Sequence, residues 1–293
     1  MTRSDACDAH LHIFDPAYPS AIPTPLAAGV PEYRCVQARL GLRRAVVVQP
    51  RHYGTDNTVL LTAIAALGMA QTRGVAVVQP TVSDDELDRM HAQGVRGIRF
   101  SLAAHAPTAK PYAPNRAIVT IDMLEPLARR VHELGWHVQV HFTADQIVEH
   151  ADLLRRLPSP LVFDHMARLP NHCPTEHPAF HAVRDLLARG RAWVKLSGAY
   201  LCSRCGAAET WRDVAPIATA FIACAPERLV WGSDWPHVTE LPEAPDAASL
   251  LALLDCWTGA EAIRRAILID NPALLYGFDS PAIPPQSVEL TAR

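Results

Sequence analysis

Eight short apolar runs rich in β-branched residues recur along the chain, and helix-like patterns fill most of the gaps between them. The runs are continuous rather than alternating, which is typical of parallel strands covered on both faces. They lie at Cys7–Phe14, Ala45–Pro50, Gly74–Pro80, Val95–Leu102, His137–Phe142, Leu161–His165, Trp193–Ser197 and Leu229–Asp234. Strands that alternate with helices predict a parallel sheet, and eight of them favour closure into a (β/α)8 barrel.

Apolar residues spaced i, i+3, i+4 predict the connecting helices. These helices are expected at Thr58–Leu67, Asp84–Gln93, Ile121–Leu134, Ala144–Leu157, Ala179–Arg189 and Asp213–Cys224. Ser83 is placed as a helix N-cap, and Gly94, Gly135 and Gly190 stand where helices should end. The alternative fold is an open doubly wound sheet, but no Gly-x-Gly-x-x-Gly follows the first run.

The length of 293 residues suits one barrel, since such barrels take about 250 residues. We therefore expect a single domain over residues 1–280 and a loosely attached C-terminal tail over 281–293. Two proline-rich stretches, Pro16–Pro31 and Pro107–Pro114, follow the first and fourth strands. Neither separates self-sufficient halves, so both are interpreted as loops on the catalytic rim.

Composition excludes several classes of partner. The net charge of −3 argues against a broad nucleic-acid surface, and no apolar run is long enough for a signal peptide or a membrane span. Seven scattered cysteines do not form a disulfide framework, which favours the reducing cytoplasm. The lone Cys202-x-x-Cys205 pair is weak evidence for metal or redox chemistry. A small-molecule substrate is the expected partner, and a homo-oligomer stays open.

Polar residues gather at or near the ends of the eight runs, where the active site of such a barrel lies. The set is Asp8, His10, His12, Gln49, Arg99, His141, Asp164, His165, Arg168, Lys195, Ser197, Asp234 and His237. Residues two apart on a strand face the same way, so His10 and His12 share one face. Buried ionisable groups are costly unless they are paired, which favours one convergent cluster.

Each of these residues also has a purely structural interpretation. An isolated strand histidine is more often a hydrogen-bonded core residue, and Asp8 could simply cap the site. Asp164 and Lys195 could pair with neighbours at the rim or the bottom of the barrel. The joint pattern is harder to explain structurally, because it combines His-x-His on the first strand, histidines on the fifth and sixth, and an aspartate after the eighth.

Longer segments resemble the amidohydrolase superfamily and, within it, the 2-pyrone-4,6-dicarboxylate lactonase branch, which also contains sugar-lactone hydrolases and a galactarolactone isomerase. The segments are Asp8-Ala9-His10-Leu11-His12-Ile13-Phe14, Val47-Val48-Gln49-Pro50, Tyr53-Gly54-Thr55-Asp56-Asn57, Gly94-Val95-Arg96-Gly97-Ile98-Arg99-Phe100, Asp164-His165-Met166, Trp231-Gly232-Ser233-Asp234-Trp235-Pro236-His237 and Asp270-Asn271-Pro272. The resemblance runs from Asp8 to about Phe278. Gly-Ser-Asp-Trp-Pro-His and Tyr-Gly-Thr-Asp-Asn are specific to the branch, whereas His-x-His alone is not.

The resemblance implies a lactone hydrolase in which Asp234 is the general base for water, hydrogen-bonded by His10 and His12. It implies that His165 polarises the lactone carbonyl and stabilises the developing oxyanion. The implied substrate-binding residues are Arg99, Arg168, His141, His237, Gln49 and Tyr53. A guanidinium fork suits a substrate carboxylate, which fits the two arginines.

The chain departs from the pyrone lactonase at two arginine positions, where His105 and Leu201, beside Tyr200, stand instead. Charge-assisted hydrogen bonds contribute roughly 1.5–3 kcal/mol each, so a dicarboxylate would be bound more weakly here. This argues against 2-pyrone-4,6-dicarboxylate as the substrate. A lactone with one carboxylate, such as an aldarolactone, or a neutral sugar lactone fits better.

The pyrone lactonase works without a metal and has a tyrosine on its fifth strand, where this chain has His141. His10, His12, His141 and Asp234 together would suit a single Zn²⁺. No lysine stands at the fourth-strand position that bridges two metals in binuclear members. The expectation is that no cofactor is required, with one Zn²⁺ as the alternative.

Other classes of function remain as alternatives. A lactone isomerase would transfer the acyl group to another hydroxyl of the same substrate. A Zn-dependent amidohydrolase or decarboxylase shares the fold and the ligand set. A non-catalytic binding protein would be expected to lack the base or a histidine, and none is missing from the sequence.

Overall fold

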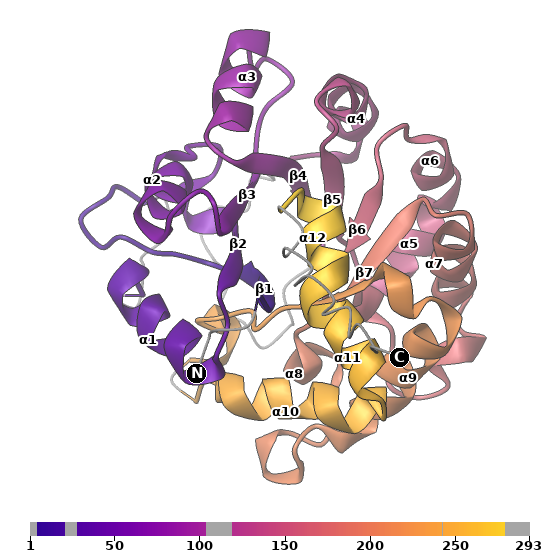
Figure 1. Cartoon of the computed structure of the whole chain (residues 1–293). Helices are drawn as coiled ribbons and strands as arrows, with labels where there is room; N and C mark the ends of the chain where they lie inside the picture. The colour runs from indigo at the N-terminus through magenta and orange to yellow at the C-terminus, as the bar shows by residue number, and fades with distance from the viewer. Residues whose placement is uncertain (1–4, 21–27, 104–118, 242, 279–293) are drawn as a thin grey trace, which may run out of the picture.

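The computed structural model describes residues 5–20, 28–103, 119–241 and 243–278, which form a barrel of eight parallel strands inside a ring of helices (Figure 1). Each strand pairs with the next in chain order. The strands are β1 Cys7–Leu11, β2 Arg44–Val48, β3 Thr72–Ala76, β4 Val95–Ser101, β5 His137–His141, β6 Leu161–Phe163, β7 Ala192–Leu196 and β8 Leu229–Trp231. The predicted barrel is confirmed, and every predicted run overlaps a strand, with boundaries that differ by up to a few residues.

The helices lie between and after the strands. They are α1 Val30–Leu40, α2 Thr58–Leu67, α3 Asp84–Ala92, α4 Leu124–Glu133, α5 Ala144–Glu149, α6 Ala151–Arg156, α7 Pro178–Ala188, α8 Ala199–Cys202, α9 Ala215–Cys224, α10 Ala247–Thr258, α11 Glu261–Arg265 and α12 Asn271–Tyr276. The hydroxyl of Ser83 accepts from the Glu86 amide at 3.2 Å, so the predicted N-cap of α3 is confirmed. Gly94, Gly135 and Gly190 each follow a helix and each have a positive φ, as glycines that end helices commonly do.

The helix prediction was incomplete in several places. The single helix expected over Ala144–Leu157 is two short helices that meet at His150. Helix α1 was also missed, although Val30, Val36 and Leu40 pack against the core beside the buried Tyr33. Helices α10 to α12, beyond the last strand, were also missed.

The barrel is closed between β1 and β8 by a few specific contacts rather than a full ladder. The Asp234 amide donates to the His10 carbonyl and the His12 amide to the Trp235 carbonyl, both at 2.8 Å. A Cβ on Gly232 would lie 2.5 Å from the His10 Cβ, so only glycine allows this close approach. The seam therefore fixes the backbone positions of His10, His12 and Asp234 relative to one another.

Asp8 stabilises this seam from inside the fold. It is fully buried, and its carboxylate accepts from the Ser233 amide at 2.9 Å, the Ser233 hydroxyl at 2.6 Å and the Tyr33 hydroxyl at 3.2 Å. Burial raises the pKa of Asp8 to about 6, and these hydrogen bonds oppose the rise. Asp8 thus joins the two strands that carry the site.

The amino-terminal end of the barrel is covered by the last described residues. Helix α12 lies across the barrel in Figure 1, and Arg73 at the start of β3 donates to the carbonyls of Tyr276 and Gly277. Asn271 donates to the Leu229 carbonyl at 2.7 Å, which attaches α12 to β8. The tail predicted for 281–293 lies outside the described residues, as do 21–27 and 107–114 of the two proline-rich loops. Among the helices that are described, none is long and apolar enough to cross a membrane.

His137, at the start of β5, gives the fold a testable pH dependence. Its ring is fully buried against Tyr276, and burial lowers its pKa to about 3, whereas an unfolded histidine titrates near 6.5. Below pH 6.5 the unfolded chain therefore binds a proton that the folded chain does not bind until about pH 3. The contribution of His137 to the free energy of unfolding is therefore fully present above pH 6.5. It is lost as the pH falls from 6.5 to about 3, by about 1 kcal/mol per pH unit.

We expect His137→Phe to lower the pH slope of the free energy of unfolding by about one proton between pH 6.5 and 4. Urea titrations of both proteins across this range measure the slopes. The difference between the free energies of unfolding of the two proteins at pH 7 measures any change in packing, separately from the effect of protonation. Parallel slopes for the two proteins would contradict the assignment.

Candidate active site

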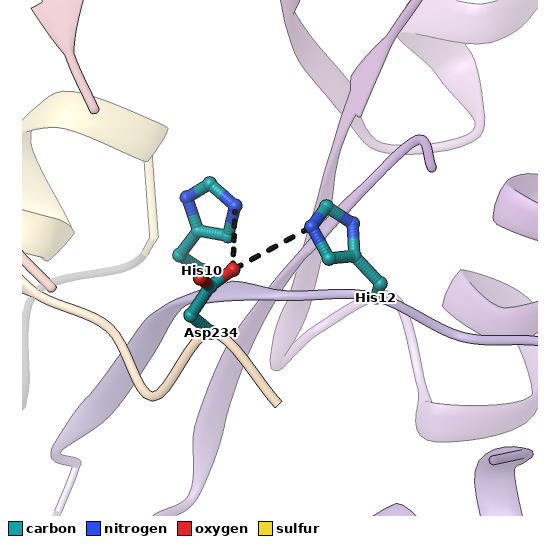
Figure 2. Close-up of side chains that lie close together, drawn as sticks. All are labelled: His10, His12 and Asp234. Carbon is teal, nitrogen blue, oxygen red and sulfur yellow. Dashed lines mark ion pairs between the residues drawn. The ribbon is translucent and has the colours of Figure 1, made fainter. Parts of the chain in front are cut away.

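Asp234, directly after β8, lies where the two strand-one histidines meet, as Figure 2 shows. Its Oδ1 is 3.4 Å from His10 Nε2 and 3.6 Å from His12 Nε2. Its Oδ2 accepts a hydrogen bond from the Tyr200 hydroxyl at 2.6 Å and lies 3.9 Å from His165 Nδ1. One oxygen thus faces two imidazoles, and the other faces a phenol.

The surroundings keep the Asp234 carboxyl ionised. Burial alone would raise its pKa, but His165, His12 and His10 outweigh burial and hold the pKa well below the usual value. Asp234 also has a φ of +61°, in the left-handed region that aspartate tolerates better than most residues. The result is a buried carboxylate in a fixed position.

A network of buried charges lies beneath this carboxylate. Asp164 Oδ2 accepts from Arg99 Nε and from Gln139 Nε2, both at 3.0 Å. Lys195 Nζ donates to the Gln139 side chain at 2.7 Å and to the Ala9 carbonyl at 2.9 Å. Asp164 and Lys195, for which the sequence left rim, bottom or catalytic positions open, both lie inside the barrel and are fully buried.

The charges in this network balance one another. Burial opposes ionisation of Asp164, but His10 and the cations of Arg99 and Lys195 together hold its pKa well below the usual value. Burial lowers the pKa of Lys195 to about 8, and the Asp164 carboxylate limits the fall. Both groups are therefore charged at neutral pH, and each compensates for the burial of the other.

His10 connects this network to Asp234. Its Nδ1 is 3.3 Å from Lys195 Nζ and 3.2 Å from Asp164 Oδ1, while its Nε2 points to Asp234. Burial and the Lys195 charge lower the His10 pKa well below 6.5. His12 instead places its Nδ1 2.8 Å from the Val48 carbonyl, which can only accept.

His165 and Arg168 lie at the two ends of a left-handed turn after β6. All four residues from His165 to Arg168 have φ between +49° and +56°. This conformation costs roughly 1–2 kcal/mol per residue for L-amino acids. The Nδ1 of His165 is 3.0 Å from the Ser197 hydroxyl. Gly198 leaves room for the His165 ring, because a Cβ on residue 198 would lie 2.7 Å from this nitrogen.

His141 and His237 both border this group. His141 Nδ1 is 2.8 Å from the Ser101 hydroxyl, and its ring meets that of His165 edge-on with centroids 5.1 Å apart. His237 places Nε2 3.0 Å from the Ser233 carbonyl, and its ring packs against Tyr200. Burial lowers the pKa of both imidazoles, so both are neutral at pH 7.

Two predicted substrate contacts are engaged in holding a loop. Gln49 donates its side-chain amide to the carbonyls of Gly54 and Asp56, at 3.2 and 2.7 Å. The Tyr53 hydroxyl donates to the Asp15 carbonyl and accepts from the Asp15 amide. Their side chains thus secure the segment after β2, and their contact with a substrate stays a prediction.

Tyr200 is the residue of this candidate site that sequence reasoning missed. It appeared only as the neighbour of Leu201, yet its hydroxyl makes the shortest contact to Asp234. Burial and the Asp234 carboxylate raise its pKa well above 10, so the phenol keeps its proton. A tyrosine one turn after a strand that ends in Lys195-x-Ser197 was the available signal. His105, the other departure, lies outside the described residues.

The residues that could ligate a metal fit one only in part. Among the described residues, two groups of side chains have potential ligand atoms within 4.8 Å of one another. The first group is His10, His12 and Asp234, and the second is His10, Asp164 and His165. His141, expected as a ligand, belongs to neither group of the described residues. His12 is oriented like a metal ligand, with Nδ1 at a carbonyl, whereas His10 has its Nδ1 at an ammonium. Cys202 and Cys205 are free thiols outside both groups.

Comparison with known proteins gives consistent matches over most of the chain. The family model described as amidohydrolase matches residues 7–278. The 4-sulfomuconolactone hydrolase of Rhizobium radiobacter is 33% identical, over 93% of this chain and 90% of its own. The D-galactarolactone isomerase of Agrobacterium fabrum is 30% identical, over 92% of this chain and 90% of its own. The 2-pyrone-4,6-dicarboxylate hydrolase of Comamonas testosteroni is 31% identical, also over 92% of this chain and 90% of its own.

A crystal structure from Agrobacterium tumefaciens has the same fold. It superposes with a TM-score of 0.82 at 28% identity, covering 94% of this chain and 97% of that one. The fold and the branch expected from the sequence motifs are both confirmed by these matches.

The contact between Tyr200 and Asp234 can be tested by Tyr200→Phe. Loss of a donor to the carboxylate raises its pKa, so the acid limb of the pH–rate profile, measured with a lactone, should move to higher pH. Tyr33→Phe is the matched control, since it removes a phenol from buried Asp8, away from the site. A Tyr200→Phe profile that coincides with the wild-type profile would refute a direct role in setting the base.

Proposed function

The chain belongs to the amidohydrolase family, and we propose from this that it hydrolyses a lactone with Asp234 as the general base. The observation that carries the proposal is the buried, ionised carboxylate with two histidines at one oxygen and a phenol at the other. A general base must be deprotonated, fixed in place and within reach of water. Asp234 meets the first two conditions through its neighbours.

In the proposed reaction, Asp234 removes a proton from water as the water oxygen attacks the lactone carbonyl carbon. His12 Nε2, 3.6 Å from Asp234 Oδ1, is placed to hold the same water. The tetrahedral intermediate collapses with cleavage of the ring C–O bond. The leaving oxygen takes the proton from Asp234, which yields the hydroxy acid and restores the carboxylate.

His165 is the proposed electrophile for the lactone carbonyl. Burial lowers its pKa to about 4, so the ring is neutral and carries one hydrogen. When the Ser197 hydroxyl donates to Nδ1, that hydrogen is on Nε2 and is available to the oxyanion. Gly198 and the left-handed turn keep the ring in this position.

The two arginines have different roles in this proposal. Arg99 has its Nε on Asp164, so only its terminal nitrogens are left for the substrate. Arg168 makes no ion pair or hydrogen bond with the described residues and is half-buried at the end of the left-handed turn. We assign Arg168 to a substrate carboxylate, which favours a lactone with one carboxylate. A metal is not required in this scheme.

Asp234→Asn tests the base directly. Asparagine has the same shape and tolerates positive φ, but it cannot accept the proton. We expect the rate of ring opening to fall at least about 100-fold with the fold preserved, which circular dichroism and thermal unfolding would check. Wild-type activity in this variant would contradict the proposal.

The product of the same assay distinguishes hydrolysis from isomerisation. The similarity to a galactarolactone isomerase favours isomerisation as the second candidate. Proton NMR shows an open-chain hydroxy acid after hydrolysis and a ring of another size after isomerisation. Both reactions need a base, so loss of activity alone does not separate them.

Arg168→Met tests the assignment of the substrate carboxylate. Loss of a charged hydrogen bond of roughly 1.5–3 kcal/mol should raise KM about 10- to 100-fold for a carboxylate-bearing lactone. A neutral lactone of the same ring should be affected little. Arg212→Met, a surface change, is the control. An equal effect on both lactones would show that Arg168 does not read the carboxylate.

A further inference from the structure

Lys195 is an unusual residue to find at the centre of this barrel. Of the 27 basic residues of the chain only two, Lys110 and Lys195, are lysines. Lys195 is fully buried on β7, where it places a compact ammonium rather than the planar fork of an arginine. Burying a cation costs free energy. The pairing with Asp164 offsets this cost but does not explain which atoms the Lys195 ammonium contacts.

The three hydrogens of the ammonium have identifiable acceptors. Two go to the Gln139 side chain at 2.7 Å and to the Ala9 carbonyl at 2.9 Å. For the third, His10 Nδ1 is at 3.3 Å, whereas Asp164 Oδ1 is at 3.7 Å, beyond hydrogen-bond distance. The third hydrogen therefore points to the imidazole of His10.

The competing arrangement would have His10 Nδ1 donate to Asp164 Oδ1. These atoms are 3.2 Å apart, close enough for that hydrogen bond, but it would leave the Nε2 lone pair facing the Asp234 carboxylate at 3.4 Å. A hydrogen on Nδ1 would also face the ammonium, placing two donors against each other. Nδ1 is therefore the acceptor, and a neutral ring then carries its hydrogen on Nε2, toward Asp234.

We propose that Lys195 fixes His10 as the Nε2–H tautomer, so that His10 faces the carboxylate of Asp234 as a hydrogen-bond donor and is not available as a ligand to a metal ion. Lys195 is thus a positioning residue that acts through His10. The tautomer follows from the contacts alone, and only its catalytic consequence rests on the proposed role of Asp234 as base.

The two histidines of this segment then differ in a way that a metal site does not allow. His12 must carry its hydrogen on Nδ1 to donate to the Val48 carbonyl, so in the neutral ring Nε2 has a lone pair. His10 has the opposite tautomer. A zinc ion bound by both rings needs a lone pair on each Nε2. Lys195 therefore disfavours metal binding at the first strand while it orients the base.

The experiment measures the tautomers directly. Long-range ¹H–¹⁵N NMR of ¹⁵N-histidine-labelled protein distinguishes a protonated ring nitrogen from an unprotonated one, and a His10→Asn variant assigns the His10 signals. The wild-type protein should show an unprotonated Nδ1 for His10. In Lys195→Met, Nδ1 can donate to Asp164, and the hydrogen should move from Nε2 to Nδ1.

Zinc binding gives a second readout, measured by equilibrium dialysis against Zn²⁺. Lys195→Met should bind Zn²⁺ at least about 10-fold more tightly than wild type, the size usual for groups that orient metal-binding histidines. Arg73→Met removes a buried cation at the far end of the barrel and should change neither readout.

A wild-type His10 with its hydrogen on Nδ1 would overturn the proposal, and this result needs no variant to fold. An unchanged tautomer in Lys195→Met would overturn it as well. Failure of the proposed function is a separate result. Full lactone turnover by Asp234→Asn would refute the role of Asp234 as the base, but it would not change the measured tautomer of His10.

Discussion

The burial of the Asp164 carboxylate inside the barrel is the constraint on which the site depends. An isolated carboxylate there would be neutral, because the interior disfavours charge. Arg99 and Lys195 keep it ionised, and it in turn allows Lys195 to keep its proton. Lys195 orients His10, and His10 faces Asp234. The geometry at the top of the barrel is therefore set by charge pairing one layer below.

A second constraint is the seam between β1 and β8. His10, His12 and Asp234 come from opposite ends of the chain, and two backbone hydrogen bonds of 2.8 Å bring them together. Asp8 and Gly232 make this approach possible, one by joining the strands and one by lacking a side chain. Residues that never meet a substrate thus determine the distances within the site.

Much of this arrangement could be predicted from the sequence, because strand alternation and the position of barrel active sites are general. His10, His12 and Asp234 follow from those rules alone. The rest depends on tertiary packing. Tyr200 lies on the short helix α8, whose four residues have no periodicity. Lys195 could point to either end of the barrel on sequence grounds, and a tautomer depends on distances of a few tenths of an ångström.

The left-handed turn from His165 to Arg168 has a consequence for how this protein can change. Selection for stability alone would place glycine at Met166 and Ala167, since glycine adopts positive φ without strain. Both side chains are instead buried, at 0% and 1% exposure, so packing beneath the turn holds its shape. New substrates are therefore more readily accommodated by changing the half-buried Arg168 than by remodelling the turn. The histidine proposed to polarise the carbonyl and the arginine proposed to bind a carboxylate can then evolve separately, although only two residues lie between them.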